Sequence, residues 1–202
     1  KWMGLDSIQP IDLKNLTERI NNSDAELVNR ILVENSLTLL QNYENLIPLE
    51  RLDTLKIASI TIGENSEKFT EMLSNYTTIT HFTIKENPSS EIQRELLDKL
   101  IGFNLVIASI HQSNENPWKA HKIDRNTDLF LQTLAIQSKV VVSVFANPYS
   151  INHFLFTNNF DGLIMAYQNS EIAQELTAQS IFGGISLSGK LPVSTQHFKN
   201  DY

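Results

Sequence analysis

The sequence predicts an α/β fold, in which helices cover both faces of a mostly parallel sheet. Short apolar runs rich in β-branched residues recur after residue 50, and stretches with apolar spacing near 3.6 residues separate them. Several of these runs are almost continuously apolar, which is typical of strands buried on both faces of a parallel sheet. Strands that alternate with helices of this length build right-handed βαβ units, so we expect a three-layer, doubly wound domain.

Each predicted element occupies one such segment. The helices open at Ser in three cases and two of them close at Gly, as helix capping favours. The order of the elements is that of a flavodoxin-like sheet. The strands are expected at 55–62 (LKIASITI), 78–84 (TITHFTI), 105–110 (LVIASI), 140–146 (VVVSVFA) and 162–167 (GLIMAY), and the helices at 66–76, 89–102, 128–138 and 170–184.

The first 50 residues have a different pattern. Residues 12–42 are amphipathic and helical in spacing, with Leu27, Ile31 and Leu39 on related faces. A turn containing Pro48 then leads into the first predicted strand. We therefore expect a helical linker at 1–50 and an α/β domain at 51–202. The opening KWMGLD is typical of a cut into a longer protein.

Composition limits the possible partners. The chain has 202 residues, a net charge of −7 and 41% hydrophobic residues, which is ordinary globular composition. Such an acidic chain is poorly suited to bind nucleic acid, since each phosphate contact needs Lys or Arg. No apolar run approaches the roughly 18 residues of a membrane span. The chain has no Cys, which excludes disulfides and thiolate sites, and the 5 His follow no metal-binding spacing, so we expect no metal and no cofactor.

The glycine-rich stretch FGGISLSGKLPVS (182–194) contains Gly184-x-x-x-x-Gly189-Lys190, which lacks only the final Ser or Thr of a phosphate-binding loop motif, where Leu191 stands. A phosphate-binding loop needs a strand, a glycine turn and then a helix. Here a predicted helix precedes Gly183 and Gly184, and the residue before Pro192 disfavours a new helix. The stretch also lacks the final Gly of G-x-S-x-G and a preceding strand. We therefore expect a helix end followed by an extended segment.

The loop HQSNENPWKAHKID is the best candidate site. It follows the strand at 105–110, and open α/β sheets bind ligands at the carboxyl ends of their strands. Its amides, carboxylate and indole ring suit the hydroxyl groups and C–H faces of a sugar. The alternative is that Trp118 packs at an interface with another domain. The candidates for ligand or interface contact are His111, Gln112, Ser113, Glu115 and Trp118.

Three segments resemble the C-terminal α/β sandwich domain of family 3 glycoside hydrolases. They are SLTLLQNYENLIPLERLDTLKIASI, VVVSVFANPYSI and LIMAYQNSEIAQELTAQSIFGGISLSGKLPVS, and the closing SGKLPVS is the most specific. The resemblance covers nearly the whole chain from about Ser36. It looks closest to the bacterial β-N-acetylhexosaminidase branch.

The resemblance implies an accessory domain of a β-glycosidase, packed on an upstream (β/α)8-type catalytic barrel in the same polypeptide. In the β-N-acetylhexosaminidase branch this domain supplies no catalytic residue, and the substrates are terminal β-linked amino sugars. In the β-glucosidase branch it supplies an acid/base Glu, for which Glu115 is the loosely matching alternative. A periplasmic or secreted location and a downstream β-lactamase-like domain are further expectations. A free-standing module that binds a small ligand is the remaining alternative.

Overall fold

The computed structural model describes residues 11–112 and 122–200, and the chain divides into two units between Leu32 and Val33. In the first unit, α1 (Leu16–Ile20) and most of α2 (Ser23–Ser36) present apolar side chains to solvent. Among the described residues, no helix is long and apolar enough to cross a membrane.

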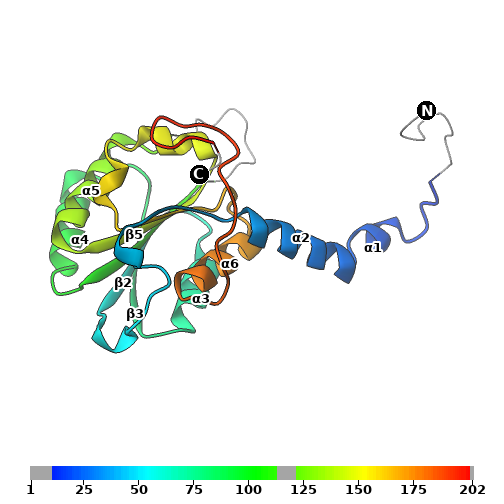
Figure 1. Cartoon of the computed structure of the whole chain (residues 1–202), viewed down its shortest axis with the longest axis horizontal. Helices are drawn as coiled ribbons and strands as arrows, with labels where there is room; N and C mark the ends of the chain where they lie inside the picture. The colour runs from blue at the N-terminus through cyan, green and yellow to red at the C-terminus, as the bar shows by residue number, and fades with distance from the viewer. Residues whose placement is uncertain (1–10, 113–121, 201–202) are drawn as a thin grey trace. The chain divides into compact units, whose positions relative to one another are not determined.

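The second unit contains a six-stranded sheet in the order β1-β6-β5-β4-β2-β3 (Figure 1). All neighbouring strands are parallel except β1, which runs antiparallel to β6. The expected mostly parallel sheet is confirmed. The strands are β1 (Thr38–Asn42), β2 (Ile57–Gly63), β3 (Ile79–Ile84), β4 (Leu105–His111), β5 (Lys139–Phe145) and β6 (Gly162–Met165).

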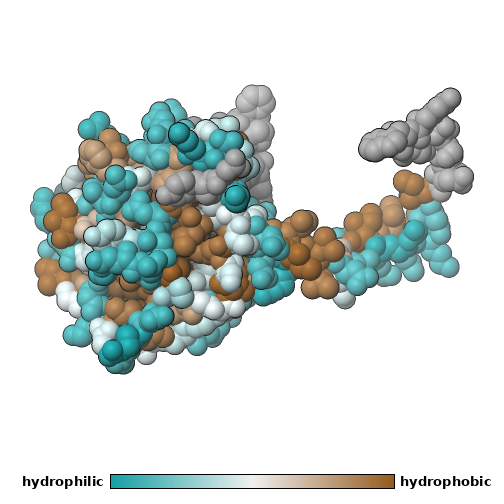
Figure 2. Space-filling model, viewed as in Figure 1, coloured by the Kyte–Doolittle hydropathy of each residue, from teal (hydrophilic) through white to brown (hydrophobic). Residues whose placement is uncertain are grey.

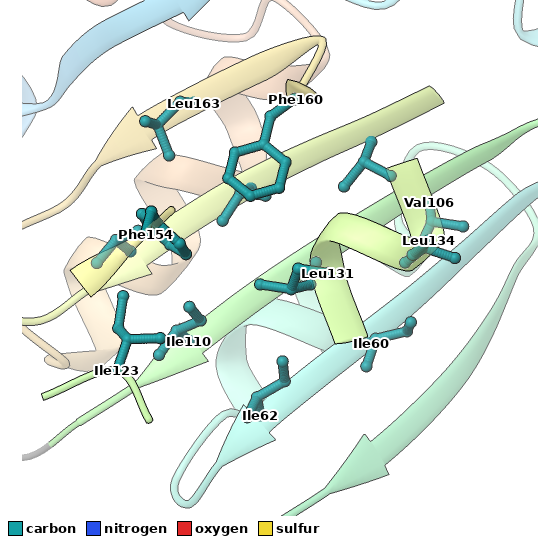
Figure 3. Close-up of a cluster of buried hydrophobic side chains, with 14 of the residues drawn as sticks. Ile60, Ile62, Val106, Ile110, Ile123, Leu131, Leu134, Phe154, Phe160 and Leu163 are labelled. Carbon is teal, nitrogen blue, oxygen red and sulfur yellow. The ribbon is translucent and has the colours of Figure 1, made fainter. Parts of the chain in front are cut away.

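Helices cover both faces of this sheet. One core cluster joins α3 and α6 to one face, and the other joins α4 and α5 to the opposite face. Figure 3 shows Leu131 and Leu134 of α5 against Val106 of β4 in the second cluster. The three-layer prediction is therefore confirmed. The helices are α3 (Glu67–Ser74), α4 (Ser90–Lys99), α5 (Arg125–Gln137) and α6 (Glu171–Ile181), with 3₁₀ turns at Tyr43–Asn45, Leu52–Thr54, Pro148–His153 and Thr157–Asn159.

Strand β1 lies where the sequence predicted a helix. Helical spacing predicted a helix through Asn42, but α2 ends at Ser36 and the chain continues as a strand. The strand pairs with β6, and Leu37 and Leu40 become fully buried. Burial of each side chain contributes roughly 1.5–3 kcal/mol, so tertiary packing outweighs the local helical preference. The compact unit consequently begins at Val33, ahead of residue 51.

The chain enters and leaves the sheet at its carboxyl edge. Thr38, the first residue of β1, pairs with Met165, the last residue of β6. After α6, the backbone N–H of Gly189 donates to the carbonyl of Leu37 at 3.0 Å. The exit segment 185–200 then buries Leu191 and Phe198.

The exit segment has no phosphate-binding geometry. Gly183 ends α6 with a φ of 78°, as expected of a C-terminal glycine cap. No helix follows it among the described residues up to 200. The strand, turn and helix order that a phosphate-binding loop needs is therefore not present there.

Candidate functional site

A cavity of about 210 Å³ opens at the carboxyl ends of β2, β3 and β4. The chain passes from β2 outward to β3 and then returns to β4 on the other side of β2. Strand order reverses at this point, and open α/β sheets bind ligands at such crevices. We call this cavity the switch pocket. Its lining residues are Gly63, Glu64, Asn65, Lys85, Glu86, His111 and Asn169.

The ends of β2 and β4 approach each other closely at the switch pocket. Gly63 pairs with His111 in the parallel register and has a φ of 110°, which side chains disfavour. A Cβ at Gly63 would lie 2.2 Å from the carbonyl oxygen of His111. Only glycine therefore fits this position without movement of the backbone.

The ring of His111 forms the floor of the pocket, and its residue is only 2% exposed. The ring stacks on Phe145 with centroids 4.5 Å apart, and Phe69 meets it edge-on at 5.9 Å. Its Nε2 lies 2.9 Å from the Oγ of Ser109, and its Nδ1 lies 2.8 Å from the Oδ1 of Asn169. Both ring nitrogens therefore have hydrogen-bond partners.

The neighbouring amides determine which nitrogen of His111 carries the proton. The Nδ2 of Asn169 donates to the carbonyl of Glu64, and its Oδ1 accepts from the Nε2 of Gln174 at 2.8 Å. Oδ1 of Asn169 can only accept, so Nδ1 of His111 donates to it. Burial lowers the pKa of the ring, so near pH 7 Nε2 carries no proton and accepts from the hydroxyl of Ser109. His111 is then neutral, and the proton that its Nε2 faces belongs to Ser109, which is fully buried.

Burial lowers the pKa of His111 from its ordinary value of 6.5 to about 4, while the hydrogen bond to Asn169 and the charge of Glu67 oppose that shift. The unfolded chain therefore binds a proton more readily than the folded chain below pH 6.5. Because of this, the free energy of unfolding should fall as the pH drops from 6.5 to 4, by about 3 kcal/mol.

Urea unfolding at several pH values checks this prediction, with His111→Gln as the comparison. The variant should lose that part of the pH dependence, and carboxylates elsewhere contribute equally to both proteins. Parallel curves for the two proteins between pH 6.5 and 4 would contradict the assignment.

Three charged side chains line the pocket. Glu64 follows β2, and Lys85 and Glu86 follow β3. None of the three forms an ion pair with another described residue. Ser109 is fully buried, so the described residues of the pocket provide no exposed nucleophile beside a base. The arrangement suits the binding of a small polar group, and the described residues contain no cluster of three or more metal-ligating side chains.

A second histidine has serine neighbours but no activated nucleophile. Nδ1 of His81 lies 2.6 Å from the Oγ of Ser59, and Nε2 lies 2.8 Å from the Oγ of Ser74. The hydroxyl of Ser74 donates to the carbonyl of Thr70 at 2.8 Å, so it accepts from Nε2–H of His81. A histidine nitrogen that carries the proton cannot remove one from Ser74. The unprotonated Nδ1 accepts from the hydroxyl of Ser59, but Ser59 is fully buried and out of reach of a substrate.

The structure places two of the sequence-predicted site residues. His111 lines the switch pocket, and Gln112 lies directly after it. The Nε2 of Gln112 donates to the carbonyl of Lys122 at 3.1 Å, and its backbone N–H donates to Phe145. Ser113, Glu115 and Trp118 lie outside the described residues. Gly63, Asn169 and Gln174 are functional-site residues that the sequence did not predict.

Comparison with known proteins gives a family match. A model described as the glycosyl hydrolase family 3 C-terminal domain matches residues 37–202. No curated protein sequence matches the chain.

Solved structures share the fold at low sequence identity. A fungal multi-domain family 3 β-N-acetylglucosaminidase is similar at 21% identity over 93% of this chain and 20% of its own, with a TM-score of 0.66. A family 3 β-N-acetylglucosaminidase from Paenibacillus is similar at 17% identity over 96% of this chain and 36% of its own, also with a TM-score of 0.66. A β-glucosidase from Listeria innocua is similar at 18% identity over 94% of this chain and 29% of its own, with a TM-score of 0.70. The chain therefore spans about a fifth to a third of these proteins.

Proposed function

The chain belongs to the family of glycosyl hydrolase family 3 C-terminal domains, and from this premise we propose that it is the accessory domain of a β-glycosidase. In this proposal a catalytic (β/α)8-type barrel precedes it in the same polypeptide. The domain packs on that barrel, lines part of the substrate cleft and performs no catalysis alone. The observation that carries the proposal is the family match over 37–202, in a chain that spans about a fifth to a third of the glycosidases it resembles.

Exposed apolar side chains in the first unit support a partner domain. Leu27, Val28 and Leu32 are each more than half exposed, and they lie on adjoining turns of α2. Figure 2 shows such apolar groups along α1 and α2. A helix surrounded by water seldom carries a continuous apolar face, because exposed apolar surface is unfavourable in water. Such a face therefore indicates burial against a partner. The proposed barrel provides that partner.

The position of the switch pocket is consistent with a contribution to the cleft. The pocket lies at the carboxyl edge of the sheet, and β1 also begins at that edge. The described residues of the pocket offer carboxylates, an amide and an ammonium group, which can all bond to sugar hydroxyls. We propose terminal β-linked amino sugars as the substrate class, since two of the similar glycosidases are β-N-acetylglucosaminidases.

Activity measurements on two forms of the protein test this function. The full-length polypeptide should hydrolyse p-nitrophenyl β-N-acetylglucosaminide faster than the corresponding β-glucoside. The isolated 202-residue chain, shown to be folded by circular dichroism, should hydrolyse neither. Robust turnover by the clean isolated chain would overturn the accessory role, and a preference for the glucoside would overturn the substrate class.

The second candidate is a β-glucosidase-type enzyme in which Glu115 protonates the leaving group. The similar Listeria β-glucosidase favours it, and so does the place of Glu115 in the sequence, shortly after β4 ends at His111. In the full-length protein, Glu115→Gln should then lower kcat by about 100-fold or more. A change of less than about threefold would leave the accessory function as the better account.

A further inference from the structure

We propose that Gln174 is a positioning residue for substrate binding, because its amide fixes the rim of the switch pocket at Glu64 and Asn65. This inference rests on the proposed function, in which the pocket lines the glycosidase cleft. Gln174 is 3% exposed and does not itself line the pocket. It acts on the pocket through the backbone that it holds.

Gln174 reaches three groups from the first turns of α6. Its Oε1 accepts from the backbone N–H of Phe69 at 3.1 Å, at the beginning of α3. Its Nε2 donates to the carbonyl of Asn65 at 2.6 Å and to the Oδ1 of Asn169 at 2.8 Å. Both amide hydrogens are thus used. The side chain joins α6 to the loop after β2 and to the loop after β6.

Asn169 binds the neighbouring carbonyl of the rim, that of Glu64. Its Nδ2 donates to the carbonyl of Glu64 at 3.2 Å, while its Oδ1 accepts from Gln174 and His111. Two successive rim carbonyls, those of Glu64 and Asn65, are therefore bound by side-chain amides. Among the described residues, neither carbonyl takes part in a backbone–backbone hydrogen bond.

The rim therefore takes its position from these two amides and not from regular secondary structure. Strand β2 ends at Gly63, and Asn65 has a φ of 57°. Asn adopts such a positive φ more readily than most other residue types do. Without the amides, no other hydrogen bond among the described residues holds the carbonyls of Glu64 and Asn65. A shift of about 1 Å in a substrate-binding group can cost on the order of 100-fold in catalytic efficiency.

The chain offers a closely matched control in Gln132. It lies on α5, on the opposite face of the sheet, and is 9% exposed. Its Nε2 donates to the carbonyl of Phe156 at 2.9 Å and to the Oδ1 of Asp128 at 3.0 Å, and its Oε1 accepts from Asn159 at 2.7 Å. Gln132 thus has the same bonding pattern as Gln174 but no contact with the pocket.

The test compares Gln174→Met with Gln132→Met in the full-length protein. Methionine keeps the length of the side chain and removes the amide. Both variants should lose similar unfolding stability, while only Gln174→Met should raise KM for p-nitrophenyl β-N-acetylglucosaminide, by about fivefold or more. Gln174→Glu restores the acceptor for Phe69 without the two donors, so it should also raise KM. Equal KM values for wild type, Gln174→Met and Gln132→Met would overturn the inference.

A second readout separates this inference from the proposed function. In the isolated chain, the NMR order parameters of the backbone at 64–66 should fall below about 0.6 in Gln174→Met and stay unchanged in Gln132→Met. Unchanged order at the rim would overturn the positioning role even if the full-length protein is active. Loss of order at the rim, together with a full-length protein that hydrolyses no glycoside, would uphold the role and reject the proposed function.

Discussion

Gly63→Ala is expected to lower the free energy of unfolding by about 3 kcal/mol, one of the two largest single-residue effects that we predict. The new Cβ would lie 2.2 Å from the carbonyl oxygen of His111, so the ends of two adjacent parallel strands would have to separate. Overpacking of this kind costs about 1–3 kcal/mol, and the positive φ adds roughly 1 kcal/mol. Denaturant unfolding of the 202-residue chain measures the loss.

Gly102→Ala is the matched control for Gly63→Ala. Gly102 also has a positive φ, of 97°, but a Cβ there would meet nothing within 4 Å. Its substitution therefore isolates the cost of the backbone conformation, which is roughly 1 kcal/mol. If the two variants lose equal stability, the contact between β2 and β4 is not what requires glycine at position 63.

Gly189→Ala is expected to destabilise the chain by about 2–3 kcal/mol through a different contact. The added Cβ would lie 2.2 Å from the carbonyl oxygen of Ser36 and 2.7 Å from that of Leu37. The hydrogen bond from Gly189 to Leu37 ties the exit segment to the beginning of β1. Both atoms belong to the backbone and cannot rotate aside, so the exit segment would have to move away from β1. Leu191, which is buried in the core, would then lose packing contacts.

Gly184→Ala provides the comparison within the same segment. There the nearest atom to an added Cβ is the hydroxyl oxygen of Tyr76, at 2.7 Å, and a half-buried side chain can turn aside. We expect a loss of less than about 1 kcal/mol. A loss at Gly189 no larger than that at Gly184 would show that the exit segment adapts easily.

The buried strands were predictable because both of their faces are covered. The apolar runs at 55–62, 105–110 and 140–146 contain few polar interruptions and match β2, β4 and β5 to within two residues at each end. Strand β1 was not predictable in the same way. Its SLTLLQN sequence suits a helix equally well, and only the pairing with β6 decides between the two.

The site was predictable only in part, for a related reason. The position of His111 after a central strand pointed to the carboxyl edge, and the structure places it in the pocket. A glycine at the end of a strand is a weak signal of close backbone approach, and Gly63 fits it. Gln174 gave no local signal. It contacts groups 105 and 109 positions earlier in the chain, and such contacts exist only in the folded structure.

A ribosome makes β1 long before it makes the strand that β1 pairs with. Thr38 pairs with Met165, and at about 5–20 residues per second their syntheses are separated by on the order of ten seconds. Strands β3, β4, β5 and β6 each lie beside a strand made earlier, so they can pair as they emerge. Leu37 and Leu40, which are buried in the folded chain, therefore stay exposed until β6 has been synthesised. A nascent chain halted before residue 162 therefore displays an unpaired apolar segment, which is a binding site for chaperones and a starting point for aggregation.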